Sequence, residues 1–138
     1  MSFLLDTNTL AELRKPAGDP LVQRWIEPIP TDELFLSVLN VGEIRRGIER
    51  LRRHDSAQAA VFEVWLTSLR RKYADRILPV TMEIAEEWAR LTVPNPLPVI
   101  DGLLAATARV HGLTLVTRNT ADFAATGVPL LNPFTPAP

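Results

Sequence analysis

Residues 3–9 read FLLDTNT, an apolar run of three residues that ends at Asp6 and continues into polar side chains. A short apolar run bounded by polar residues is typical of a buried strand. A carboxylate at the inner end of such a strand is costly to bury unless a positive or hydrogen-bonding group meets it. The position of Asp6 therefore requires a partner elsewhere in the chain.

Strands and helices are expected to alternate along the rest of the chain. The strands are expected at 2–5, 34–37, 77–80, 113–117 and 128–131. Helices are expected at 8–14, 19–28, around 41–51, at 57–73, after Thr81, and from Asp101 to Gly112. This order predicts an α/β fold: a mostly parallel central sheet of about four to five strands, with helices on both faces. The length suits a single domain over residues 1–138.

Composition excludes several classes of protein. The chain is 46% hydrophobic and 22% charged, as in an ordinary folded domain. It has no cysteine, which excludes disulfides, thiolate metal sites and a cysteine nucleophile. No apolar run approaches the roughly 18 residues that span a bilayer, so we expect a cytoplasmic protein with no membrane contact.

Four acidic residues lie at the ends or flanks of expected core elements: Asp6, Glu43, Asp101 and Asp122. Asp6 and Asp122 follow strands whose carboxyl ends would share one sheet edge, where ligands of such sheets bind. Glu43 and Asp101 are embedded in the apolar runs VGEI and VIDGLL. If the four converge, they repel one another unless a cation lies among them.

Each of these carboxylates also has an ordinary structural interpretation. Asp6 and Asp101 precede helices and could be N-caps, and Asp122 could cap a turn. Glu43 could pair with Arg46 or Arg50, because residues three or seven apart lie close on one helix face. Taken singly these interpretations stay open. Together they do not explain why all four acids adjoin apolar core segments.

The side chains available suggest which cation such a cluster would hold. Only His54 and His111 could supply imidazole, and without thiols zinc is disfavoured. Carboxylates and water suit Mg²⁺ or Mn²⁺, and magnesium commonly shares its shell with a substrate phosphate. Residues 45–76 hold nine basic and four acidic residues, a net charge of +5 that suits a polyanion, although it could also be a solvated helix face.

Five blocks of the sequence resemble successive blocks of the PIN-domain ribonucleases. They are LLDTN (4–8), LS with VGEIRRG (36–37 and 41–47), VIDGLLAATA (99–108), LVTRN with DF (115–119 and 122–123) and LNPF (131–134). The chain is most similar to the VapC toxins, including the FitB-like branch, of type II toxin-antitoxin modules. The resemblance covers residues 4–134 in order, and five blocks in sequence make it specific.

The resemblance implies an Mg²⁺- or Mn²⁺-dependent endoribonuclease whose acidic quartet is Asp6, Glu43, Asp101 and Asp122. Asp6 and Asp101 match the most consistent metal ligands, while Glu43 and Asp122 would bind directly or through water. In some members of the family the fourth acid directly follows the Thr-Arg pair, and in others it lies a few residues later. The first of these positions is Asn119 here and the second is Asp122, so Asp122 or Asn119 completes the site. Asn8, Ser37, Thr117 and Asn119 would orient ligands or substrate, or else make ordinary strand-end hydrogen bonds. Metal-activated water would hydrolyse RNA, leaving 5′-phosphate and 3′-hydroxyl ends.

The resemblance also implies partners. Members form homodimers and are neutralised by a VapB-like antitoxin, which alone contacts DNA and which docks between helices near the N-terminus and after Glu43. Two alternatives remain from the residues: a metal-dependent phosphatase on a small substrate, or a catalytically idle PIN-like binding module. RNA cleavage should weaken steeply with salt, whereas a small-substrate phosphatase should not. Loss of function in Asp101→Asn would exclude the idle module.

Overall fold

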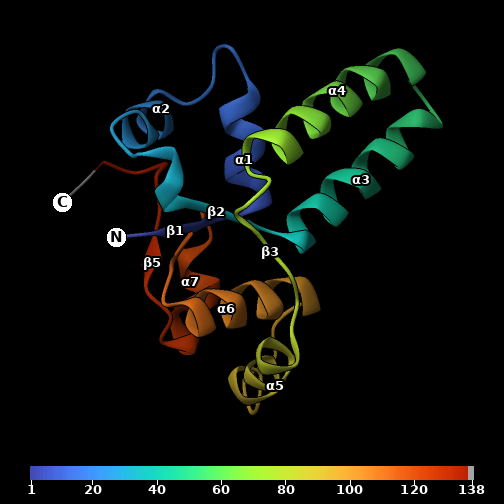
Figure 1. Ribbon diagram of the computed structural model, residues 1–138. Helices are drawn as coiled ribbons and strands as arrows, with labels where there is room; N and C mark the ends of the chain where they lie inside the picture. Colours follow the sequence, from blue (N-terminus) through green and yellow to red (C-terminus); the bar gives the residue numbers. More distant parts are fainter. Residues whose placement is uncertain (137–138) are drawn as a thin grey trace.

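The computed structural model describes residues 1–136 and is built on one sheet of five parallel strands in the order β3-β2-β1-β4-β5 (Figure 1). The strands are β1 (Phe3–Leu5), β2 (Leu34–Ser37), β3 (Ile77–Leu78), β4 (Thr114–Val116) and β5 (Leu130–Leu131). The expected α/β class and strand number are therefore confirmed. Residues 137 and 138 of the expected domain lie outside the described residues.

Helices cover both faces of the sheet, as expected. Figure 1 shows α1 to α4 on one side and α5 to α7 on the other. Their bounds are α1 (Thr7–Arg14), α2 (Pro20–Ile26), α3 (Val38–Arg52), α4 (Ser56–Lys72), α5 (Met82–Leu91), α6 (Val99–His111) and α7 (Thr120–Phe123). Within residues 1–136, none of these helices has both the length and the apolar character needed to cross a membrane.

The central strand supplies side chains to two separate cores. Phe3 and Leu5 pack with residues of α1, α3 and α4, whereas Leu4 packs with residues of α6, β4 and α7. This alternation follows from the two-residue period of a strand. Because both faces of β1 are covered, all three of its residues are apolar and buried. The strand thus holds its carboxyl end, and the Asp6 that follows, in a fixed place.

The start of α6 differs from the expected one. The helix begins at Val99 with Pro98 as its N-cap residue, so Asp101 lies in the first turn and is not the cap. Proline is tolerated here because the N–H groups that begin a helix have no intrahelical acceptor. At the other end Gly112 adopts a left-handed conformation (φ 65°) and ends the helix as expected.

Helices α5 and α6 pack closely at Gly102, the residue after Asp101. A Cβ atom added there would lie 2.8 Å from Trp88 Cδ1 and 3.0 Å from Thr92 Cγ2. Real Cβ atoms essentially never lie within 3.0 Å of another atom, so a larger residue would require α6 or the Trp88 side chain to shift. This contact fixes the first turn of α6 against α5.

Candidate metal centre

The carboxyl edge of the sheet contains a small acidic cavity. Its volume is about 70 Å³, and its lining is Asp6, Thr7, Asn8, Glu43, Asp101, Leu104, Thr117, Asn119 and Phe123. Asp6 follows β1, Thr117 follows β4, and Glu43 lies on the helix that continues from β2. The fold therefore brings Asp6, Glu43 and Asp101 together from distant parts of the sequence, at the edge where ligands of parallel sheets bind.

Asp6 performs the structural role that was left open for it. Its Oδ1 accepts a hydrogen bond from Thr9 N at 2.8 Å, which makes it the N-cap of α1. Its own backbone N–H donates to Val116 O at 3.1 Å and ties it to β4. Only 9% of the residue is exposed. One carboxylate oxygen thus anchors the helix, which fixes the direction of the other.

A chain of hydrogen bonds fixes the carboxylate of Glu43. Thr7 Oγ1 donates to Glu43 Oε1 at 2.7 Å and accepts from Asn40 Nδ2 at 3.0 Å. Asn40 is fully buried, and its Oδ1 accepts from Ser37 N at 2.7 Å. Glu43 makes no ion pair with Arg46 or Arg50 in the described part of the chain, so that interpretation is wrong. We call Asn40 and Thr7 the Glu43 relay.

Negative charges on neighbouring side chains act on the carboxyl of Asp101. Its partial burial raises the pKa of the carboxyl, and the charges of Glu43, Asp122 and Asp6, in that order, raise it further. Each of these effects disfavours the ionised form. A cation placed among the carboxylates would reverse them. The electrostatics of the cavity therefore favour binding of a positive ion.

The remaining candidates divide into those at the cavity and those outside it. Asn8, Thr117 and Asn119 line it, and Thr117 Oγ1 accepts from Asn119 N at 3.1 Å. Asp122 lies in α7, is exposed and is not among the lining residues, although its charge acts on Asp101. Ser37 is buried as the N-cap of α3, bonded to Leu39 N and Asn40, which matches the strand-end interpretation.

The donor set fits a hard divalent cation held partly through water. Asp6, Glu43 and Asp101 offer oxygen ligands, and the lining contains neither histidine nor cysteine. Across residues 1–136, no three acidic or histidine side chains lie close enough to bind one ion together as they stand. Magnesium usually keeps several water ligands and takes only one or two carboxylates, so this wider spacing suits it.

The sequence patterns did not identify the Glu43 relay. Ser37 and Asn40 form a capping box, with Ser37 at the N-cap and Asn40 in the third position of α3. That Ser-x-x-Asn spacing is visible in the sequence and could have marked Asn40 as buried. The contact with Thr7 has no local signal, because it joins residues 33 positions apart.

Comparison with known proteins identifies the family of the chain. The PIN domain family model matches residues 3–128, and the chain belongs to that family. Its relatives include bacterial proteins named as a toxin and as VapC ribonucleases. It is 32% identical to toxin FitB of Neisseria gonorrhoeae, over 96% of this chain and 98% of that protein. It is 33% identical to VapC ribonuclease Y4jK of Sinorhizobium fredii, over 98% of this chain and 99% of that protein.

Solved structures show the same fold. The crystal structure of FitAcB from Neisseria gonorrhoeae matches with a TM-score of 0.86 at 32% identity, covering 96% of this chain and 98% of that one. A toxin-antitoxin complex from Klebsiella pneumoniae matches with a TM-score of 0.69 at 28% identity, covering 96% and 98%. The resemblance to VapC and FitB toxins is therefore confirmed.

Proposed function

We propose that this protein is a Mg²⁺- or Mn²⁺-dependent endoribonuclease and the toxin of a type II toxin-antitoxin module. The observation that carries the proposal is the convergence of Asp6, Glu43 and Asp101 in one cavity, with the pKa of Asp101 raised by burial and by its acidic neighbours. Perturbed carboxylates in a cavity are typical of functional sites. The similarity to a VapC ribonuclease supports the choice of RNA as substrate.

The four acids would have distinct tasks. Asp6 and Asp101 would ligate the ion, and Glu43, whose direction the relay sets, and Asp122 at the rim would contact it through water. When bound, the ion supplies an activated water and neutralises charge on the phosphate. Asn8 and Asn119 line the cavity and would donate hydrogen bonds to phosphate oxygens.

Cleavage of RNA by the purified, antitoxin-free protein tests the proposal. We expect cleavage with Mg²⁺ or Mn²⁺, none in EDTA, and none in Asp6→Asn or Asp101→Asn. Asparagine caps helices as well as aspartate does, so Asp6→Asn should stay folded. Asp32→Asn, at an exposed position in the turn Thr31–Glu33, is the matched control and should cleave normally. Cleavage in EDTA, or by both cavity variants, would refute the metal mechanism.

A VapB-like antitoxin is the proposed partner, and two adjoining cavities, a larger one of mixed polarity and a smaller apolar one, offer it a groove. One of about 500 Å³ lies among α1, α2 and α4, and one of about 220 Å³ lies among α1, α3 and α4. Trp65 lines both, and Arg14 stacks 4.3 Å from the ring centre of Phe62 beside it. An amphipathic helix fits such a groove. The protein should co-purify with the product of an adjacent small DNA-binding reading frame, and Trp65→Glu should prevent this.

We also propose that the protein is cytoplasmic and forms a homodimer. Val99 begins α6, two residues before Asp101 of the acidic cavity, and is 59% exposed. A second copy of the chain would cover this exposed apolar side chain. Sedimentation of the antitoxin-free protein should give the mass of a dimer, and a monomer at micromolar concentration would contradict this part of the proposal.

A further inference from the structure

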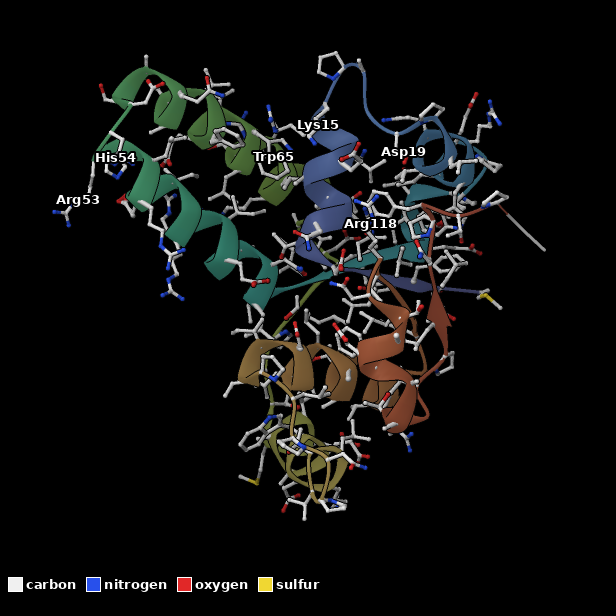
Figure 2. All side chains as sticks on the ribbon, turned by 180° about the vertical axis from the view of Figure 1, so that it is seen from behind. Lys15, Asp19, Arg53, His54, Trp65 and Arg118 are labelled. Atoms are coloured by element: carbon white, nitrogen blue, oxygen red, sulfur yellow. The ribbon has the colours of Figure 1, made fainter. Side chains whose placement is uncertain are left out.

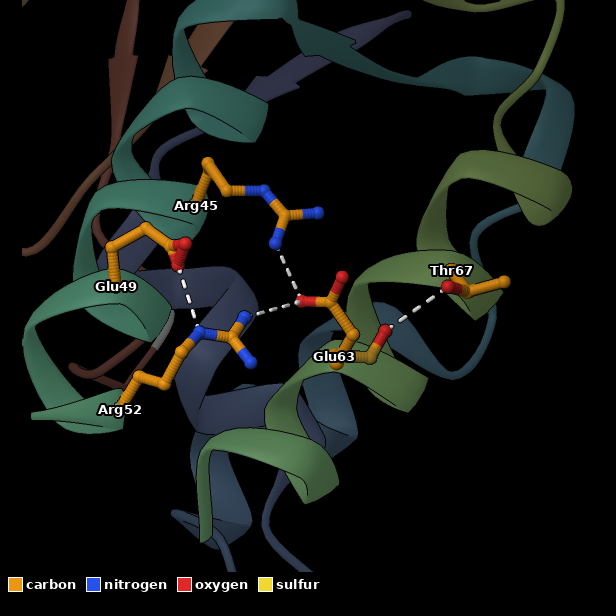
Figure 3. A network of polar contacts seen from close by, with 5 residues as sticks. All are labelled: Arg45, Glu49, Arg52, Glu63 and Thr67. Carbon is orange, nitrogen blue, oxygen red and sulfur yellow. Dashed lines mark hydrogen bonds and ion pairs between the residues drawn. The ribbon is translucent and has the colours of Figure 1, made fainter. Parts of the chain in front are cut away.

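Helix α3 carries arginines on two faces, and one set is already neutralised. Arg45 and Arg52 point toward α4, where both contact the carboxylate of Glu63, and Arg52 also contacts Glu49 at 3.1 Å (Figure 3). Arginines that are already paired with a carboxylate bind another anion less strongly. The face of α3 toward α4 is therefore a structural contact between the two helices.

Other basic residues of segment 45–76 lie far from the acidic cavity. Arg76 Nε donates to Leu34 O at 3.1 Å, at the amino end of β2, and the cavity lies beyond the other end. Three strand residues span about 10 Å. Arg53 lies at the tip of the α3–α4 hairpin, away from the sheet (Figure 2). The net charge of +5 is therefore not a single patch.

Two arginines remain beside the cavity. Arg46 and Arg50 lie one helical turn apart and line a groove of about 370 Å³. Glu43 lines both this groove and the acidic cavity, so the two adjoin at Glu43. In the described part of the chain, neither arginine takes part in an ion pair or a side-chain hydrogen bond. The groove is also lined by Gly42, Glu43 and Gly47 and by the apolar residues Val38, Leu39 and Ile100, and we call it the arginine groove.

Glycines keep the arginine groove open. A Cβ atom added at Gly42 or Gly47 would meet nothing within 4 Å. Glycine weakens a helix interior relative to alanine, and here no packing contact requires it. Missing side chains at two positions of an exposed helix face allow a ligand to approach the helix closely. The arginine groove is therefore shaped for an extended, negatively charged chain.

We propose that the arginine groove binds the ribose-phosphate backbone of single-stranded RNA as it leads away from the acidic cavity. Arg46 and Arg50 would each contact one phosphate, for which the guanidinium fork is well suited. Residues four apart on a helix rise by about 6 Å, a spacing similar to that of successive phosphates in an extended strand. This inference rests on the proposed ribonuclease function and assigns a binding track to it.

The arginine groove is positively charged and the acidic cavity is negatively charged, and this difference determines which phosphate of the substrate lies in each. Flanking phosphates are attracted to Arg46 and Arg50, whereas the scissile phosphate can enter the acidic cavity only with a cation. A strand bound along the arginine groove would therefore place its next phosphate at Glu43. Arg46 and Arg50 are positioning residues in this scheme, since they would bind substrate and transition state equally.

The test removes the charge of each groove arginine and compares the effect with that of removing an arginine charge far from the groove. Arg46→Gln, Arg50→Gln and the control Arg71→Gln, at an exposed position in the last turn of α4, are assayed on a short single-stranded RNA that the wild-type protein cuts. Each groove variant should raise KM about 3- to 10-fold with kcat within about twofold, the result of losing uniform binding. The control should match the wild-type protein.

Salt dependence of binding gives a second readout. In an Asp101→Asn background, which binds without cutting, each groove substitution should lower the slope of log affinity against log salt by about 0.7. Gly42→Gln, which fills the groove without changing charge, should also raise KM, with an unchanged or higher thermal midpoint. If Gly42→Gln loses substrate affinity without losing stability, the loss comes from filling the groove and not from unfolding.

The possible results decide between occupants. Groove variants that match Arg71→Gln in KM and salt slope would overturn the binding track and leave the ribonuclease function standing. Variants that lose antitoxin binding or dimer formation but keep RNA binding would make the groove a protein interface, which also overturns the proposal. A wild-type protein that neither cuts nor binds RNA would overturn both the track and the proposed function.

Discussion

Replacing Thr7 by valine tests the Glu43 relay with the least change of shape. Valine keeps the branched side chain but removes the hydroxyl that joins Asn40 to Glu43. Asn40 is fully buried, so its amide loses a partner and gains no water. An unsatisfied buried polar group costs about 1–3 kcal/mol. The free energy of unfolding should fall by about this amount, measured by urea denaturation.

The same substitution should weaken metal binding. Glu43 is exposed, so water will replace the hydrogen bond that it loses from the Thr7 hydroxyl. The substitution therefore changes the direction in which the Glu43 carboxylate points. Loss of a group that orients a metal ligand typically costs 10- to 100-fold in metal affinity or activity. We expect about tenfold, because the relay orients only one of several ligands. Calorimetric titration of the metal-free protein with Mn²⁺ measures this directly.

Two controls make the result specific. Thr7→Ser keeps the hydroxyl and should resemble the wild-type protein in both stability and Mn²⁺ affinity. In a Glu43→Ala background, Thr7→Val should still destabilise the fold but should not weaken Mn²⁺ binding further, because the two substitutions act on one ligand. Wild-type Mn²⁺ affinity in Thr7→Val, or full additivity with Glu43→Ala, would refute the relay.

Four substitutions have clear expected outcomes. Burial and neighbouring acids raise the pKa of Asp101, so the metal-free fold loses stability as pH rises through that pKa. Asp101→Asn should therefore raise the thermal midpoint in EDTA near about pH 7. This gain should vanish below the usual aspartate pKa of about 3.9. Gly102→Ala should destabilise the protein by about 1–2 kcal/mol in urea unfolding, because the contact with Trp88 outweighs the better helix propensity, whereas Gly47→Ala should be neutral or stabilising. Asp122→Asn should slow RNA cleavage less than Asp101→Asn does, since Asp122 does not line the cavity; equal loss in single-turnover rates would place it among the ligands.

Much of the fold could be predicted because its central strands are short, continuous apolar runs. Leu4 and Leu115 are fully buried and lie between helices on both faces, which is why no charged residue interrupts their strands. Helix α7 could not be predicted, because four residues are too few to show a period. The start of α6 was misplaced because three prolines precede it, and the last of them serves as its N-cap.

The site was predictable where charge conflicts with its surroundings. Asp6, Glu43 and Asp101 could be identified because each interrupts or ends an apolar run, and the cavity contains all three. The roles of the arginines were not predictable from net charge. Helical periodicity divides Arg45 from Arg46, but only the packing of α3 against α4 decides which of them is paired.

The pairing of β1 with β4 has a consequence for synthesis of the protein. Strand β1 is synthesised before the other four strands and is the middle of the sheet, and its Leu4 pairs with Leu115 of β4, far along the sequence. Such distant pairing forms late, after most of the chain is available. A nascent chain that stops short of residue 114 lacks the strand that positions Thr117 and Asn119 and so has no complete acidic cavity. The chain must therefore be synthesised through Asn119 before the site can assemble, so any activity of the acidic cavity begins only after that point.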